Sequence, residues 1–195
     1  MADGGTISGG AIKRLETYRR LVLRWNRRLA LVSRGAPEEA LDRLTGQALE
    51  ALGALPTGLR TLIDVGSGAG LPGIPIAIAR PGMAVRLVER GENKQLFLKE
   101  AVRTLGLENV ELVHESFGPE VVRGPRPLAV TAVGLGGYIE LASSVRPRLK
   151  AGDGLLLFVG RDLAEGIARH VGGVRLDWRR LRESDKTGVA WIEAE

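Results

Sequence analysis

From about residue 60 onward, short apolar segments alternate with segments of helical character, and this alternation constrains the fold most strongly. We expect strands at residues 61–65, 84–88, 109–113, 128–133 and 154–159, and helices at 71–79, 92–105, 138–149 and 163–170. Such alternation is typical of parallel strands joined by helical crossovers. The pattern therefore predicts an α/β fold whose doubly wound, mostly parallel sheet has helices on both faces.

Two further features refine this prediction. Residues 174–181 and 189–193 read as strands with no helix between them, so they predict a closing antiparallel hairpin with a turn at 184–188. Within the first helix of the sheet region, Pro72 suits the first turn, and Pro75 is expected to distort the helix locally.

The amino-terminal region has a different character. Residues 11–34 contain eight basic residues and one acid, and their apolar residues recur every three or four positions. This spacing predicts one amphipathic helix with an arginine-rich outer face. A second helix is expected from Pro37 to about Gly53, before a breaker at 55–58. We therefore predict a helical extension over residues 1–58 and a cofactor-binding domain over residues 59–195.

The arginine-rich face allows two interpretations. It is either a solvated helix surface or a surface that contacts the phosphates of a nucleic acid, and the net charge of +5 permits the second. The candidate nucleic-acid contacts, which the resemblance given below would make RNA contacts, are Arg19, Arg20, Arg24, Arg27 and Arg28.

Composition excludes several classes of site. The chain has no cysteine, which excludes disulfides, thiolate metal sites and a cysteine nucleophile, and its two histidines leave little for a metal centre. The longest apolar run, residues 155–159, is too short to cross a bilayer, and residues 1–10 do not resemble a secretory signal. We expect a cytoplasmic protein with no metal and no membrane partner; the sequence gives no indication of an oligomeric state.

A glycine loop at residues 66–70 follows the first expected strand and enters a helix. In open parallel sheets ligands bind at the carboxyl ends of the strands, and glycines there let the backbone approach a ligand. A dinucleotide fingerprint would need a third glycine at position 71, which is Leu71. The spacing, preceded by Asp64, instead resembles motif I of class I S-adenosylmethionine-dependent methyltransferases. Glu89 ends the next strand, where a carboxylate can accept hydrogen bonds from ribose hydroxyls; the alternative is a structural turn and a surface acid.

Residues 64–81, above all Leu-Pro-Gly-Ile-Pro at 71–75, closely resemble the RsmG (GidB) family, which methylates guanine N7 in small-subunit ribosomal RNA. The stretches 24–26, 97–100, 105–111, 140–141 and 147–152 also match. The resemblance implies S-adenosylmethionine as cofactor and ribosomal RNA or the small ribosomal subunit as partner. Together, the loop and the resemblance predict a cofactor site made of Asp64, Gly66, Ser67, Gly68, Gly70, Leu71, Glu89, Arg90 and Phe117.

The sequence departs from the family pattern at four places. An Arg-Ala-Glu after the third strand is replaced by Ser-Phe-Gly at 116–118, and an arginine after the fourth strand is replaced by Val133. The Arg-His-Phe-Leu-Asp-Ser motif of the second helix is changed at 43–48, and a Lys-Gly after the fifth strand reads Val-Gly at 159–160. Phe117 either packs on the adenine or belongs to the core.

The chemistry of guanine N7 bears on these departures. N7 exposes a lone pair that can attack a methyl sulfonium without prior deprotonation, so the lack of a plausible general base or nucleophile in the sequence is compatible with N7 methylation, and the catalytic residues stay unknown. Three functions stay open: an RsmG-like guanine-N7 methyltransferase, a diverged cofactor-binding paralogue with another acceptor, and a non-enzymatic binding module.

Outside the cofactor site, Trp178 and Trp191 are expected in the core, and Arg180 and Arg182 on one face of a strand.

Overall fold

The computed structural model describes residues 8–134, 136–182, 184 and 186–195. The predictions for residues 1–10 and for the turn at 184–188 therefore lie partly outside the described residues. The strands are β1 (Thr61–Val65), β2 (Ala84–Val88), β3 (Val110–Val113), β4 (Leu128–Ala132), β5 (Gly154–Val159), β6 (Val174–Arg180) and β7 (Gly188–Ala194). The α-helices are α1 (Gly9–Asn26), α2 (Pro37–Glu50), α3 (Gly73–Ala79), α4 (Glu92–Leu105), α5 (Tyr138–Val145) and α6 (Arg161–Val171). Short 3-10 helices are η1 (Ala51–Gly53), η2 (Pro119–Val121) and η3 (Arg146–Arg148).

All seven strands form one sheet in the order β3-β2-β1-β4-β5-β7-β6. The first five strands are parallel, and β7 runs antiparallel to both β5 and β6. β1, β4 and most of β5 are buried, as expected of strands covered on both faces. The predicted doubly wound sheet with a closing antiparallel hairpin is confirmed.

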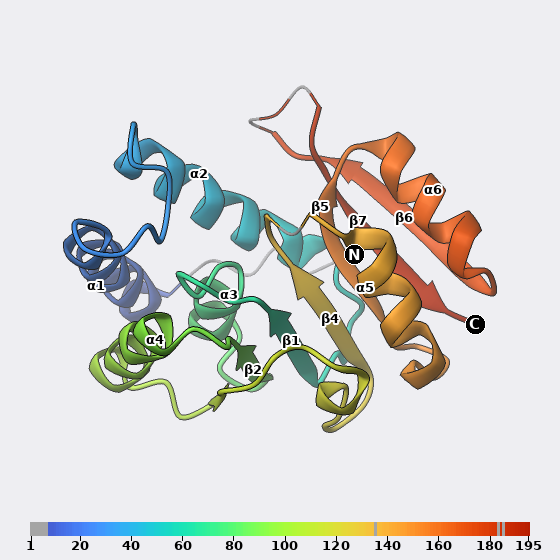
Figure 1. The fold of residues 1–195 in the computed structure, drawn as a ribbon, viewed down its shortest axis with the longest axis horizontal. Coiled ribbons are helices and arrows are strands. Elements are labelled where there is room, and N and C mark those ends of the chain that lie inside the picture. Colours follow the sequence, from blue (N-terminus) through green and yellow to red (C-terminus); the bar gives the residue numbers. More distant parts are fainter. Residues whose placement is uncertain (1–7, 135, 183, 185) are drawn as a thin grey trace.

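The helices lie in two layers, one on each face of the sheet (Figure 1). α1 contacts α2, α3 and α4 on one face, whereas α5 and α6 contact each other on the other face. Buried residues of α1 and α2 belong to the same apolar core as those of α3 and α4. The two amino-terminal helices are thus continuous with one face of the sheet, and a division at residue 58 stays a prediction.

The first helix is shorter than predicted. α1 ends at Asn26, because the Asn26 side-chain oxygen accepts the backbone N–H groups of Leu31 at 2.8 Å and Val32 at 2.9 Å. These two bonds fix a turn where the apolar spacing predicted a continuing helix. Val32 is still buried, so the periodicity identified core residues correctly but placed the helix end wrongly.

Several smaller boundaries differ as well. α3 begins at Gly73, so Pro75 is its third residue. The N–H groups of Ile74 and Ile76 donate to the Gly70 and Pro72 carbonyls at 2.7 and 3.2 Å, and Pro75, which has no N–H, leaves out the bond between them; a local distortion at Pro75 stays a prediction. The helix predicted to run to residue 149 ends at Val145 and continues as η3. β6 ends at Arg180, so Arg182 lies beyond the strand and does not share a strand face with it.

Candidate functional site

The glycine loop is fastened to the carboxyl end of β2. The backbone N–H groups of Gly66 and Ser67 donate to the Val88 carbonyl at 2.8 and 3.1 Å. The Ser67 hydroxyl donates to the Asp64 carbonyl at 2.8 Å, which closes the turn on its own strand. The loop is therefore a fixed turn between two adjacent strand ends.

The three loop glycines have different roles. Gly66, Gly68 and Gly70 all have positive φ angles, of 68°, 53° and 81°. A Cβ on Gly70 would lie 2.4 Å from Ile74 Cδ1, so this glycine is needed for packing under the loop. A Cβ on Gly66 would meet nothing within 4 Å. The loop thus leaves open space at Gly66, where its backbone can face a ligand.

Glu89 lies beside this open space at the end of β2. Its side chain is buried, with one carboxylate oxygen accepting the Gly68 N–H at 3.0 Å and the other accepting the Gly91 N–H at 2.8 Å. A carboxylate has about four acceptor positions. Two of these positions are still available for two hydroxyl donors, which is the pattern that the vicinal hydroxyls of a ribose present.

Gln95 of α4 holds the strand end that carries Glu89. Its amide nitrogen donates to the Glu89 carbonyl at 2.8 Å and to the Val113 carbonyl at 3.0 Å, which ties β2 to β3. Gln95 is not among the site residues predicted from the sequence. The available signal was a polar residue on the inward stripe of a helix that also buries Leu98 and Leu105.

Asp64 stabilises the start of α3. One carboxyl oxygen accepts the Gly73 N–H at 3.2 Å, and the other is buried without a partner among the described residues. Complete burial raises the pKa of Asp64 to about 8; the Glu89 carboxylate adds to this shift, and the Gly73 bond opposes it. A Cβ at position 73 would lie 2.3 Å from Leu87 and 2.8 Å from Asp64, so only glycine fits this contact.

Tyr18 connects α1 to the glycine loop. Its hydroxyl donates to the Ala69 carbonyl at 2.8 Å, and the residue is fully buried. Burial, followed by the nearby Asp64 carboxyl, raises the pKa of Tyr18. Tyr18 is one of the regularly spaced apolar residues between 11 and 34, and that spacing does not predict this bond.

The remaining predicted cofactor residues lie in different environments. Leu71 is buried, whereas Arg90 is exposed and its carbonyl lies 3.1 Å from His114 Nε2. Phe117 is half-buried and packs against the core on the α5 and α6 side of the sheet. Val133 is half-buried directly after β4. Asp64, the glycine loop and Glu89 therefore form one connected unit.

The five predicted RNA contacts divide into two groups. Arg19 pairs with Glu38 and Asp42, each at 2.7 Å, and Arg24 pairs with Glu100, which also accepts the indole N–H of Trp25. The other three are exposed and form no ion pair with an acid in the described ranges. We call these the unpaired amino-terminal arginines: Arg20, Arg27 and Arg28.

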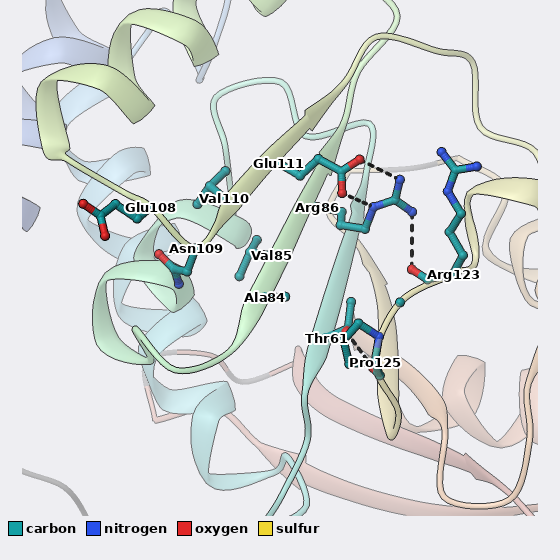
Figure 2. Close-up of a pocket in the computed structure, with 11 residues that line it drawn as sticks. Thr61, Ala84, Val85, Arg86, Glu108, Asn109, Val110, Glu111, Arg123 and Pro125 are labelled. Carbon is teal, nitrogen blue, oxygen red and sulfur yellow. Dashed lines mark hydrogen bonds and ion pairs between the residues drawn. The ribbon is translucent and has the colours of Figure 1, made fainter.

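A hollow of about 500 Å³ lies at the opposite edge of the sheet, by the first residues of β1, β2 and β3 (Figure 2). Figure 2 shows the buried Arg86 facing Glu111, with two nitrogen–oxygen contacts of 2.8 and 3.0 Å. The Arg86 guanidinium also donates to the Val121 carbonyl. Its hydrogen bonds to Glu111 keep the pKa of that carboxyl below its usual value. The hollow is a structural ion-pair site, separate from the loop and Glu89.

Membrane-spanning helices and metal-binding clusters are both absent from the part of the chain that the structure describes. In that part, no helix is both long and apolar enough to span a membrane. No group of three or more metal-ligating side chains occurs there.

Comparison with known proteins assigns the chain to a family. The family model GidB, described as rRNA small subunit methyltransferase G, matches residues 11–174. The ribosomal RNA small subunit methyltransferase G of Alkalilimnicola ehrlichii is 36% identical over 168 residues, covering 85% of this chain and 74% of that protein. Its namesake from Acidiphilium cryptum is 33% identical over 209 residues, covering 97% and 95%. The chain belongs to this family.

Membership of the methyltransferase G family confirms the resemblance seen at residues 64–81. Among solved structures, a ribosomal protein L11 methylase from Lactobacillus delbrueckii subsp. bulgaricus superposes with a TM-score of 0.61 at 16% identity, covering 78% of this chain and 79% of that one. At that identity the likeness concerns the fold, which is the class I methyltransferase arrangement. In this methyltransferase G chain, the loop and Glu89 lie at the carboxyl edge where that fold binds ligands.

Proposed function

We propose that the chain is an S-adenosylmethionine-dependent methyltransferase that modifies guanine N7 in small-subunit ribosomal RNA. The observation that carries this proposal is Glu89, buried beside the open face of the glycine loop with two acceptor positions left. Family membership supplies the class of acceptor. Against the alternative of a surface acid, Glu89 is buried and its carboxylate is oriented by two backbone N–H groups.

The residues present fit this cofactor. Glu89 is suited to bind the ribose hydroxyls, and the loop from Gly66 to Gly68 offers a backbone surface with no side chain in the way. Phe117 is half-buried and can offer apolar surface to the base, whereas Leu71 is buried in the core on the other face of the sheet; Arg90 follows Glu89 directly. Asp64 and Ser67 are assigned to holding the turn in shape, since the Ser67 hydroxyl donates to the Asp64 carbonyl at the end of β1 and the Asp64 carboxyl accepts the Gly73 N–H at the start of α3. When bound, S-adenosylmethionine supplies an electrophilic methyl group.

The protein's contribution to such a reaction is positioning. Guanine N7 carries an exposed lone pair, so the acceptor needs no base to remove a proton before it reacts. Correct alignment of reacting groups can contribute roughly 7–11 kcal/mol to lowering a barrier. Because the loop and Glu89 occupy the β1 and β2 ends of the carboxyl edge, the ends of β4 and β5 are the side from which a guanine can approach.

The RNA itself is proposed to meet the basic amino-terminal surface, whether it is bound as free ribosomal RNA or within the small subunit. All five predicted arginines are candidates. The unpaired amino-terminal arginines should contribute most to phosphate binding, because the charges of Arg19 and Arg24 are already neutralised by acids. We further propose that residues 1–58 act as the RNA-facing extension of the domain at 59–195.

Methyl transfer to small subunits that lack the modification tests this function. Purified protein and labelled S-adenosylmethionine are incubated with such subunits or with their RNA, and nucleosides are analysed for 7-methylguanosine. The proposal predicts label in 7-methylguanosine for the wild type and a strongly reduced rate for Glu89→Gln. Label in another nucleoside would identify a paralogue with a different acceptor, and cofactor binding without any transfer would identify a binding module.

A further inference from the structure

The indole ring of Trp178, on β6, is held in a fixed position at the carboxyl edge of the sheet, and this fixed ring is called the platform below. Its indole N–H donates to the Val159 carbonyl, the last residue of β5, at 3.0 Å. The ring crosses β7 at Gly188, where a Cβ would lie 2.3 Å from the indole carbons. A residue with a side chain at position 188 would displace the ring, so the close approach and the hydrogen bond fix its orientation together.

Arg161 lies on this platform. Its guanidinium carbon is 4.6 Å from the centre of the Trp178 ring, which is a cation–π contact. The side chain is nevertheless 60% exposed. The Trp178 ring thus holds the guanidinium in place while most of the side chain stays accessible to solvent, and an accessible, preorganised guanidinium is a good phosphate ligand.

The charge of Arg161 is largely uncompensated. Its one ion pair with the described residues is to Glu165 at 3.9 Å, which is beyond hydrogen-bond distance, and both side chains are exposed. The other charged groups nearby in the fold are Asp162, the next residue of α6, and Lys186, whose carbonyl adjoins Gly160. Exposed pairs of this kind are worth little, so the guanidinium donors are available to an external anion.

The position of this cation matches the acceptor side proposed above. Arg161 begins α6 directly after β5, and Trp178 lies across β7, two strands or about 10 Å from β4. The loop and Glu89 occupy the β1 and β2 ends of the same edge. A guanine that enters from the β4 side would therefore bring its flanking backbone past Arg161.

We propose that Arg161, held on Trp178, binds a phosphate of the RNA backbone next to the acceptor guanine. The inference rests on the proposed function for the identity of the polyanion. Arg161 acts here as a positioning residue: it contacts the RNA strand and not the reacting atoms.

Equilibrium binding of an unmodified small-subunit RNA transcript, measured across a range of salt concentrations, tests this proposal. Arg161→Gln should weaken binding about three- to tenfold at moderate salt and lower the slope of log K against log salt by about 0.7–0.9, the loss of one phosphate contact. Arg161→Lys should keep the slope but recover only part of the affinity, because lysine retains the charge without the planar stacking group. The matched control is Arg169→Gln, an exposed arginine on the last turn of the same helix.

The outcomes separate the two proposals. Equal losses for Arg161→Gln and Arg169→Gln, with normal binding by the wild type, would overturn the Arg161 site while leaving the methyltransferase proposal intact. A selective effect of Arg161→Gln would support the site even if the modified nucleoside proved to be another base. If the wild type binds an acidic polypeptide as tightly as the transcript and Arg161→Gln affects both alike, the phosphate assignment is wrong.

Discussion

Replacing Asp64 by asparagine should remove a strong pH dependence from the stability of the fold. Asp64 has a pKa of about 8 in the folded chain, against roughly 3.9 for an unfolded aspartate. Between these values the unfolded carboxyl is ionised while the folded one stays neutral, so the folded state binds the extra proton. The free energy of unfolding contributed by Asp64 is therefore fully present below pH 4 and is lost as the pH rises to about 8.

The magnitude follows from the shift. Each pKa unit corresponds to about 1.4 kcal/mol, so between pH 5 and pH 8 the contribution falls by up to about 4 kcal/mol. Asparagine has no ionisable group and keeps an oxygen to accept the Gly73 N–H. Its amide nitrogen would occupy the position of the unpartnered oxygen and would be a buried donor without an acceptor. This lowers the free energy of unfolding by an amount that does not vary with pH.

Chemical denaturation of both proteins at pH 5, 6.5 and 8 measures the effect. From pH 5 to pH 8 the free energy of unfolding of the wild type should fall by several kcal/mol relative to that of Asp64→Asn. Asp162→Asn, an exposed aspartate on α6, is the control and should run parallel to the wild type. If Asp64→Asn also runs parallel, Asp64 ionises in the fold as an ordinary aspartate, and the reasoning from its burial is refuted.

Three further predictions concern the loop and the amino-terminal surface. Tyr18→Phe should lower the free energy of unfolding by about 1–3 kcal/mol in denaturation experiments, because the buried Ala69 carbonyl loses its donor; an unchanged midpoint would contradict the contact. Gly70→Ala should lower the free energy of unfolding by more than about 2 kcal/mol in the same assay, because the new Cβ would collide with Ile74 and alanine disfavours a φ of 81°. A variant as stable as the wild type would show that the loop can relax. Changing the unpaired amino-terminal arginines to glutamine should lower the salt slope of RNA binding by about 2–3, whereas Arg19→Gln should change it little; equal effects per residue would place RNA on the whole face.

The parallel sheet and its hairpin could be predicted because strand and helix periodicities are local properties of the sequence. Residues 61–65, 84–88, 92–105 and 154–159 have the predicted bounds. The end of α1 could not be predicted from periodicity, because it depends on the Asn26 side chain competing for backbone donors in the next turn. The apolar stripe continued past that turn and concealed it.

The parts of the candidate site that lie within one local motif could be predicted from the sequence. The parts that depend on contacts between distant segments could not. The loop and Glu89 follow directly from the sequence order of strand, turn and strand. Gln95 and Tyr18 act through contacts to residues far along the chain, as do the ion pairs of Arg19 and Arg24, and no local pattern predicts such partners. These tertiary contacts decide which of the predicted residues are free to bind.

Titration calorimetry of S-adenosylmethionine against the wild type and Glu89→Gln tests the central claim most directly. Hydrogen bonds to charged groups contribute about 1.5–3 kcal/mol, so Glu89→Gln should bind the cofactor roughly 10- to 100-fold more weakly. Glu92→Gln, an exposed acid in the first turn of α4, should bind as the wild type does. No binding heat with the folded wild type, or equal affinities for the wild type and Glu89→Gln, would contradict the assignment of this edge as a cofactor site.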